Sequence, residues 1–503
     1  MEILEFTEDS LAKSLTNEFT GISVIKEKKQ YLFLNDYLGD KGLKTQTIVI
    51  EEEYISKDFL EGYTSYYSYC FEKYSKNCRR VHFFKNSFDV DVFQNQLVSN
   101  NNGFWENYLG FIVVKPIPIT TIGYTLLKTY GGNSNRKFWG TRDYEVHLFG
   151  KEITIDSLAF QEQDTVIAAC ATTAIWSMLN KASLDFHTIL KSPSEITKDA
   201  DNVSPDGSRL FPNRGLSLLQ ICQSIVNSGL VTEVKLGDIN RTANEKVVSI
   251  LYIKKILNAY SPIGIPIILV VQVPSGNGYG LHAVTVSGYL QKEPELKPPS
   301  IDITWYAEDI EKVYVHDDQW GPFARVNFNN DYELETHWTI NDSTNRPTFV
   351  KNIVVPVYPK IRISYESIES ITHGLDRILT FFFNGKIVAD IIWDIKIDYS
   401  ENFKKRIKHS NLKKEEKINL LTTSIPKYIW ISKCYISDTE LLEFVFDATG
   451  VANAMLGLNV ICHLPDKEKG ILRTFLEKNE ATLKRLISHK DRSNYYDFFI
   501  KSL

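Results

Sequence analysis

The middle of this chain is organised around one segment, which reads Gln163-Asp164-Thr165-Val166-Ile167-Ala168-Ala169-Cys170-Ala171-Thr172-Thr173-Ala174. The residues before Cys170 show no period, whereas the apolar residues after it repeat with helical spacing at Ala171, Ala174, Ile175, Met178 and Leu179. This change predicts a helix that begins at Cys170 and buries one face. A thiol in the first turn of a helix feels the partial positive charge of the helix end, which favours the thiolate.

Two later segments carry an imidazole and two carboxylates. Gly280-Leu281-His282-Ala283-Val284-Thr285-Val286-Ser287-Gly288-Tyr289 follows a glycine-rich loop and predicts a strand that begins at His282. Val313-Tyr314-Val315-His316-Asp317-Asp318-Gln319-Trp320-Gly321-Pro322 predicts a strand that ends at Asp317 and Asp318. Because side chains alternate along a strand, we expect only one of these carboxylates to face His282. His316 belongs to the strand, and we assign it no role.

The three segments supply an amide, a thiol, an imidazole and a carboxylate, which is the set that a nucleophilic thiol requires. Each residue alone has a common structural explanation. A cysteine is often a small buried hydrophobic residue, and a histidine at a strand end often binds a loop carbonyl. The functional hypothesis therefore depends on the combination and its order, and not on any single residue.

This combination resembles the papain-like cysteine peptidase superfamily, and more loosely its C39-like bacterial branch. In papain the catalytic histidine likewise begins a His-Ala-Val strand that ends in Gly-Tyr with the same spacing, and an Asn-Ser-Trp-Gly segment follows. The matching residues here are Gln163, Cys170 with its helix, His282-Ala283-Val284 with Gly288-Tyr289, and Asp318-Gln319-Trp320-Gly321. The resemblance spans about residues 155–330 and implies an α+β fold, in which a helical subdomain and an antiparallel sheet enclose a cleft.

Carried over residue by residue, the resemblance implies that Cys170 is the nucleophile and His282 the general base and acid. Gln163 would donate to the oxyanion beside the Cys170 N–H. The chain departs from the pattern in two places. Gln163 lies seven residues before Cys170 where papain has six, which leaves Gln161 as a competitor, and Ala171 stands where papain has serine and the C39-like branch usually has glycine.

The residue that orients the histidine stays open between two neighbours. Alignment to the Asn-Ser-Trp-Gly segment of papain selects Asp318. Alignment to the Asp-Pro-x-x-Gly pattern of the C39-like branch selects Asp317, with Asp318 in the proline position. We favour Asp317, because the whole segment around it is more similar to that branch.

The resemblance implies a thiol-dependent hydrolase that cleaves a peptide or isopeptide bond through an acyl-enzyme on Cys170, with a protein or peptide substrate and with no cofactor or metal. Two alternatives use the same residues differently. A transglutaminase or acyltransferase would pass the acyl group to an amine, and an inactive papain-like protein would serve as a binding or scaffold module. Bacteriocin-leader processing is not implied, because the chain lacks the phosphate-binding loop of an export ATPase. An activating protein partner is compatible with the large flanking blocks.

Composition indicates an ordinary globular protein. The 503 residues are 43% hydrophobic and 24% charged, with a net charge of −5 that gives no support to a nucleic-acid partner. Six scattered cysteines without a C-x-x-C pair are typical of a reducing cytoplasm. The acidic N-terminus has no basic region of a signal peptide, and the longest apolar run, Ile263 to Val273, is too short to span a bilayer. We therefore expect a cytoplasmic protein without a membrane partner.

The length predicts more than one domain. We expect an N-terminal α/β domain over residues 1–150, with a helix from Ser56 to Lys76 and a strand from Gly110 to Lys115. The papain-like domain covers residues 151–345. A C-terminal α/β domain over residues 346–503 begins with a strand from Phe349 to Tyr358, and the apolar run from Ile378 to Phe383 is interpreted as another strand. The basic run from Lys404 to Lys417 is interpreted as a solvated helix face, and the tail from Lys467 as helical.

Overall fold

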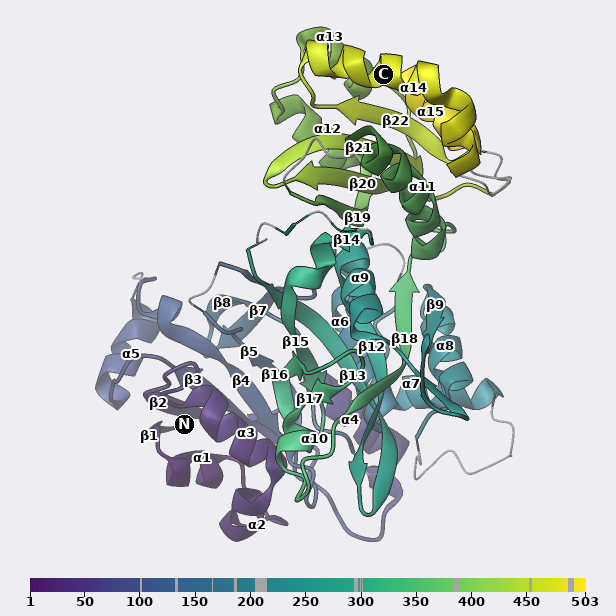
Figure 1. The fold of residues 1–503 in the computed structure, drawn as a ribbon. Coiled ribbons are helices and arrows are strands. Elements are labelled where there is room, and N and C mark those ends of the chain that lie inside the picture. Colours follow the sequence, from purple (N-terminus) through teal and green to yellow (C-terminus); the bar gives the residue numbers. More distant parts are fainter. Residues whose placement is uncertain are drawn as a thin grey trace. The chain divides into compact units, whose positions relative to one another are not determined.

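The computed structural model describes residues 1–99, 102–131, 134–164, 166–184, 188–203, 215–293, 297–298, 300, 302–383, 389–451, 455–486 and 493–503 (Figure 1). Their helices and mainly antiparallel sheets confirm the predicted α+β class. The chain forms two compact units. The first comprises Met1–Val248, Ile265–Leu290 and Lys312–Pro356, and the second comprises Ser249–Gly264, Gln291–Glu311 and Val357–Leu503. The expected boundaries near 150 and 345 do not coincide with these units, because the first and middle blocks pack into one unit.

The first unit contains a five-stranded antiparallel sheet. Its order is β1 (Glu2–Glu5), β2 (Thr47–Tyr54), β3 (Cys78–Phe84), β4 (Tyr108–Val114) and β5 (Ile122–Leu127). The accompanying helices are α1 (Glu8–Ser14), α2 (Ile22–Glu27), α3 (Lys29–Leu38), α4 (Lys57–Ser65) and α5 (Val90–Val98). The strand expected at Gly110 is confirmed as β4. The helix expected from Ser56 to Lys76 is shorter, because Tyr66 leaves the helical conformation (φ −143°, ψ −58°).

A second, larger sheet of the first unit carries the segments singled out in the sequence. Its order is β17 (Leu334–Glu335), β16 (Gly321–Phe328), β15 (Ile310–Asp317), β13 (Gly278–Gln291), β12 (Ile267–Ser275), β18 (Phe349–Val357) and β9 (Val231–Leu236), and β6 (Arg136–Lys137) pairs with β13. The strands expected at Ile265, His282, Lys312 and Phe349 correspond to β12, β13, β15 and β18. This sheet therefore carries two of the four functional groups expected from the sequence, the imidazole of His282 on β13 and the carboxylate of Asp317 on β15.

Helices lie against this sheet in the first unit. They are α6 (Cys170–Ala182), α7 (Pro193–Ala200) and α8 (Leu218–Asn227). The Thr285 hydroxyl of β13 donates a hydrogen bond to the Ala174 carbonyl of α6 at 2.8 Å, which fixes the helix to the sheet. α8 ends near Ser228 and Gly229, with Gly229 at φ 94°, a conformation common at helix C-termini. Two short hairpins, β7 (Arg142–Leu148) with β8 (Lys151–Ser157) and β10 (Ile239–Thr242) with β11 (Glu245–Val247), complete the unit.

The second unit has a five-stranded sheet with helices on both faces. The order is β14 (Thr304–Trp305), β19 (Ile391–Tyr399), β20 (Tyr428–Ile436), β21 (Thr439–Asp447) and β22 (Gly457–Cys462). Its helices are α9 (Ile250–Tyr260), α11 (Tyr365–Phe383), α12 (Ser400–His409), α13 (Lys414–Thr422), α14 (Asp466–Leu486) and α15 (Ser493–Ser502). The strand expected from Ile378 to Phe383 is wrong, because these residues belong to α11. The run 404–417 is divided between two helices, α12 and α13, with a break after His409, and the helical interpretation of the tail is confirmed by α14 and α15.

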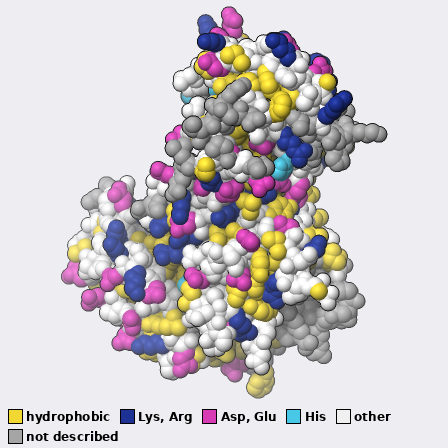
Figure 2. Space-filling view, in the orientation of Figure 1, with side chains coloured by type: hydrophobic (Ala, Val, Ile, Leu, Met, Phe, Trp, Pro, Cys, Tyr) yellow, Lys and Arg dark blue, Asp and Glu magenta, His cyan; other side chains and the backbone are white. Residues whose placement is uncertain are grey.

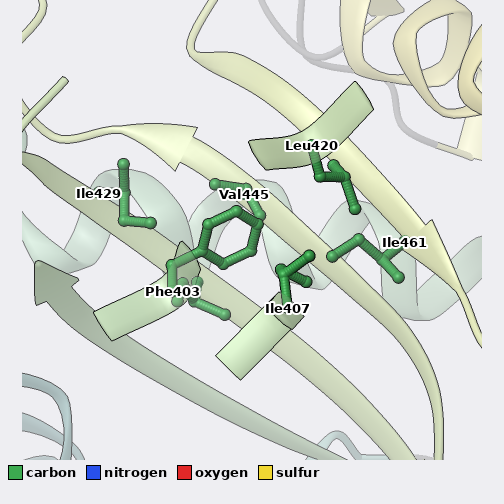
Figure 3. Packing of buried hydrophobic residues seen from close by; sticks show 7 residues of the cluster. Phe403, Ile407, Leu420, Ile429, Val445 and Ile461 are labelled. Carbon is green, nitrogen blue, oxygen red and sulfur yellow. The ribbon is translucent and has the colours of Figure 1, made fainter. Parts of the chain in front are cut away.

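Alternation along β20 assigns its two faces. Ile429 and Ile431 pack with Phe403 and Ile407 of α12 in one cluster of buried side chains (Figure 3). Ser432, one residue further along, points to the opposite face, where its hydroxyl lies 3.0 Å from that of Thr372 in α11. The central strand is therefore buried on both sides, which explains its nearly continuous apolar sequence.

The surface and the helices offer no sign of a membrane span. Among the described residues, no helix combines the length and the apolar character that crossing a bilayer requires. Acidic and basic side chains are interspersed on the face seen in Figure 2, in keeping with the small net charge.

Candidate active site

Cys170 is the first residue of α6, as the sequence predicts. Ala169 before it is extended (φ −89°, ψ 175°) and provides no side-chain cap, so the first N–H groups of the helix are available to other partners. The apolar face named in the sequence is buried. Cys170 itself is half-buried and lines an open cleft. The thiol is thus fixed by a rigid element and remains accessible.

The segment before Cys170 is held by Asp164. One carboxylate oxygen of Asp164 accepts hydrogen bonds from the backbone N–H groups of Val166 and Ile167, at 2.8 and 3.3 Å. The other oxygen accepts a hydrogen bond from the hydroxyl of Tyr67. The hydroxyl of Thr197 in α7 donates to the Ile167 carbonyl at 2.8 Å. Sequence reasoning missed Asp164, although an aspartate that binds the N–H two residues later is a known turn signal.

The two glutamines that competed for the oxyanion role lie in different places. Gln163 lines the same cleft as Cys170 and His282. Gln161 instead lines a separate small cavity with Asp58 and Lys115, and its buried Nε2 has no hydrogen-bond partner. The amide that can reach a substrate at Cys170 is therefore that of Gln163.

His282 is buried in β13, next to the hairpin that joins β12 and β13. The strand begins at Gly278 and not at His282, because Gly278 and Tyr279 already pair with Ser275 and Pro274. The backbone of His282 therefore lies within a regular antiparallel pairing, opposite Val271. A histidine within a paired strand is held more rigidly than a histidine at the end of a strand.

Asp317 at the end of β15 is the hydrogen-bond partner of His282. Its Oδ1 lies 2.9 Å from His282 Nε2 and also accepts from the Gln319 backbone N–H at 3.0 Å. Its Oδ2 accepts from Trp338 Nε1 at 2.9 Å. The Cys170 thiol lines the same cleft as this imidazole, and its interaction with the ring contributes to raising the pKa of His282. Because Nε2 faces the carboxylate, the other ring nitrogen, Nδ1, is the one left for the thiol.

Asp318 also lies close to His282, which differs from the expectation that only one carboxylate would face the ring. Its Oδ1 is 3.5 Å from Nε2, but neither of its buried carboxylate oxygens makes a hydrogen bond. Strict alternation fails here because the strand ends at Asp317 and the chain turns, with the Trp320 N–H bound to the Asp317 carbonyl at 2.9 Å. Asp317 is thus the better-placed orienting group.

Three aromatic residues surround the carboxylate side of the site. Trp338, in the short helix α10 (His337–Ile340), packs edge-on against the His282 ring at 5.4 Å between centroids. Trp320 stacks on His337. Lys29 of α3 places its ammonium 4.3 Å from the centre of the Trp338 ring. None of these contacts was predicted from the sequence, because they join elements that are far apart along the chain.

The N-terminal block contributes directly to this side of the site. Gln30 Nε2 donates to the Asp318 carbonyl at 3.2 Å. Phe33 packs so closely on Gly321 that an added Cβ would lie 2.1 Å from its ring. The glycine after Trp320 is therefore required by the approach of α3, and the first block supports the turn that carries both carboxylates.

The site favours a charged His282 beside a charged Asp317. Burial alone would lower the pKa of His282, but the charge and hydrogen bond of Asp317, together with the hydrogen bond to Cys170, raise it well above its ordinary value. Burial would raise the pKa of Asp317, and the His282 charge with the bonds from His282, Trp338 and Gln319 instead lowers it. Burial raises the pKa of Asp318 to about 7, with a further contribution from neighbouring Asp317.

A second buried histidine, His316 in β15, has a structural role. His316 Nε2 donates to the Leu158 carbonyl at 3.0 Å, and its Nδ1 accepts from the Phe323 N–H. Burial lowers its pKa to about 4, so it stays neutral. These contacts agree with the decision to assign it no catalytic role.

Two clusters have a composition that could hold a metal ion. In the first, one ligand atom each of His282, Asp317 and Asp318 lie within 4.8 Å of one another, but the Asp317 oxygens and the ring nitrogen are already engaged with each other, Trp338 and Gln319. In the second, the described residues Glu440 and Glu443 are already paired with Lys433 and Arg406, and His463 lies 3.1 Å from Glu440. Neither donor set calls for a metal.

The cleft around Cys170 has a volume of about 870 Å³. One wall is formed by Gly215 to Leu218 and Ile221 at the start of α8, and the other by β12, β13 and β18. Leu281 is 68% exposed at its edge. This volume lies within the range of ordinary ligand pockets and is also large enough for a short peptide segment.

Neither a scan of protein-family models nor a search of curated proteins finds a match to this chain.

Proposed function

We propose that the protein is a papain-like thiol hydrolase that cleaves a peptide or isopeptide bond. The observation that carries this proposal is the hydrogen bond that joins the imidazole of His282 to the carboxylate of Asp317, in a cleft that Cys170 also lines. The open cleft leaves room for a short peptide segment.

The geometry supports an ordinary acyl-transfer sequence. Charged His282 and the start of α6 favour the Cys170 thiolate, which attacks the substrate carbonyl carbon to form a C–S bond. The Gln163 amide and the N–H groups at the helix start stabilise the oxyanion. His282 then gives its proton to the departing amine as the C–N bond breaks. In the second half, His282 takes a proton from water, whose oxygen attacks the thioester and releases the carboxylic acid and the thiolate.

The first test measures the reactivity of the thiol. We expect iodoacetamide at pH 5.5 to alkylate Cys170 much faster than Cys222, a half-exposed cysteine on α8 that serves as an internal control. His282→Ala should remove this advantage. Equal rates for the two cysteines in the wild type, read by peptide mass spectrometry, would contradict an activated nucleophile.

The second test identifies the reaction. A cell lysate is incubated with the wild type or with Cys170→Ala, and new N-termini are compared by mass spectrometry. We expect new peptide ends with the wild type alone. Products that carry an added amine in place of water would indicate acyl transfer, and the absence of any new product would count against both activities.

A further inference from the structure

One wall of the cleft contains an irregular strand pairing. Val270 of β12 pairs with Asn352 of β18, but Val271 pairs with Val350, so Lys351 is left opposite neither residue. This is a β-bulge, a feature that re-aims a side chain and is frequent beside active sites. Side chains of a regular strand alternate between faces, yet both Lys351 and Asn352 are half-buried and line the cleft. The bulge therefore brings a lysine onto the substrate face.

The charge of Lys351 is only partly compensated. Its ammonium lies 3.5 Å from Glu245 Oε1, which accepts a closer hydrogen bond from Gln272 at 2.6 Å. The other oxygen of Glu245 is bound by Arg241 at 2.8 Å. Two cations thus share one carboxylate, and the group carries a net positive charge.

The rest of the cleft offers few competing charges. Apart from His282, Lys351 is the one basic side chain among the described residues that line it. The one carboxylate in the lining, Asp164, has both oxygens occupied by Tyr67 and by backbone N–H groups. An anionic group that enters the cleft would therefore be attracted toward the β18 wall.

The pairing of the strands gives the approximate distance between the β18 wall and the strand that carries His282. Asn352, Val270 and Ala283 form one row across β18, β12 and β13, and Ala283 is the neighbour of His282. Adjacent strands are about 4.8 Å apart, so β18 lies about 10 Å from β13. An extended peptide advances about 3.3 Å per residue. The Lys351 wall is thus within reach of a side chain two or three residues from the scissile bond.

We propose that Lys351, together with Asn352, forms a subsite for an acidic side chain of the substrate. This inference rests on the proposed hydrolase function, because it places the acidic residue relative to the bond attacked by Cys170. It identifies the substrate class as peptides with Asp or Glu within three residues of the cleaved bond.

The test uses peptidyl epoxides that alkylate cysteine irreversibly and extend from the epoxide in either direction. Each peptide is made as a matched pair with Glu or Gln at one position, and the alkylation rate of Cys170 is followed by mass spectrometry. In the wild type we expect a preference of about fivefold for Glu at one position, as for a partly screened ion pair. The preference should shrink at high salt.

Two variants and a control separate the subsite from general effects. Lys351→Gln should abolish the preference for Glu over Gln, and Lys351→Glu should reverse it in favour of a Lys peptide. Lys408 is an exposed lysine of α12 that does not belong to the cleft lining, so Lys408→Glu makes the same charge change and should retain the wild-type preference. Equal rates for Glu and Gln peptides in the wild type, or a preference that survives Lys351→Gln, would overturn the subsite. Failure of every epoxide to label Cys170, neutral ones included, would instead refute the hydrolase and the subsite with it.

Discussion

Two neighbouring carboxylates approach one imidazole nitrogen in this site. Asp317 lies 2.9 Å from His282 Nε2 and is fully hydrogen-bonded, whereas Asp318 lies at 3.5 Å without a hydrogen bond. A hydrogen bond fixes the direction of the ring, and a nearby charge alone does not. The geometry therefore gives the two residues different tasks despite their identical chemistry.

Substitution of each carboxylate separates these tasks. We expect Asp317→Ala to lower kcat/KM for peptide cleavage by about 100-fold or more, because the base loses its orienting partner. Asp318→Asn should cost less than about threefold, since it removes no hydrogen bond to the ring. Steady-state kinetics on one peptide substrate measure both. The reverse order of effects would identify Asp318 as the orienting residue, as the alignment to papain implied.

The indole of Trp338 is predicted to position Asp317. Trp338→Phe removes the N–H that binds Asp317 Oδ2 but keeps an aromatic ring beside His282. Loss of a hydrogen bond to a charged group should lower kcat/KM by about tenfold. Trp320→Phe is the matched control, because its buried Nε1 has no hydrogen-bond partner. Similar effects of both substitutions would show that ring packing, and not the N–H, is what matters.

The core of the candidate site could be predicted because its residue types and their order along the chain are informative. Cys170 and His282 belong to segments with a clear local pattern. Trp338 could not be predicted, since it follows Asp317 by 21 positions and lies in a helix of four residues with no periodic signal. The orientation of Asp318 was predicted wrongly, because alternation applies only while a strand continues.

At the scale of elements, the start of α6 depends on the segment that precedes it. Asp164 closes a turn by binding two backbone N–H groups, and Tyr67 satisfies its second oxygen from η1 (Tyr67–Tyr69). These contacts fix the path of the chain between Gln163 and Cys170. The N-terminal block thus helps to place the two residues proposed to bind the oxyanion.

Tyr67→Phe tests this support. The substitution leaves a buried carboxylate oxygen without its donor, so the free energy of unfolding should fall by about 1 to 3 kcal/mol. Chemical denaturation measures the change, and Tyr69→Phe is the control, because Tyr69 is 83% exposed in the same 3-10 turn. Alkylation of Cys170 should also slow in Tyr67→Phe. Unchanged stability would mean that another group replaces the lost donor.

Helices and strands were predicted best where the apolar residues of a segment follow a single helical or strand period. The helix at Cys170 and strands β12, β13, β15 and β18 follow clear patterns. The run Ile378 to Phe383 was misread as a strand, because a short apolar run has no decisive period by itself. Read together with Ile368, Ile371 and Leu375, it shows the helical spacing that α11 buries. The helical period can therefore be recognised over residues 368–383, but not in residues 378–383 alone.

At the scale of the whole molecule, the two compact units do not correspond to consecutive blocks of the sequence. The first unit combines the N-terminal sheet with the sheet that carries the site, through contacts such as the pairing of Thr125 with Phe160. Such pairing between distant segments leaves no local signal, which is why a three-domain division was expected. Burial of the site within this unit also couples its charges to global stability.

The coupling predicts a specific dependence of stability on pH. Asp318 has a folded-state pKa of about 7, above its unfolded value near 3.8, so the folded protein binds this proton more tightly. Stability from this group is present at low pH and is lost as the pH rises from about 4 to 7. The raised pKa of His282 acts in the same direction at higher pH, whereas the lowered pKa of Asp317 stabilises the fold above about pH 4.

Asp318→Asn isolates what the Asp318 carboxyl, whose pKa is raised, contributes to the stability of the fold. The amide cannot ionise, so the variant should be more stable than the wild type at pH 8, by on the order of 2 kcal/mol, and the difference should vanish near pH 4. Chemical denaturation across this range measures it, with Asp331→Asn, an exposed carboxyl beyond β16, as the control. A stability difference that stays constant with pH would mean that Asp318 is ionised in the folded protein, and that the buried site holds two negative charges beside one imidazolium.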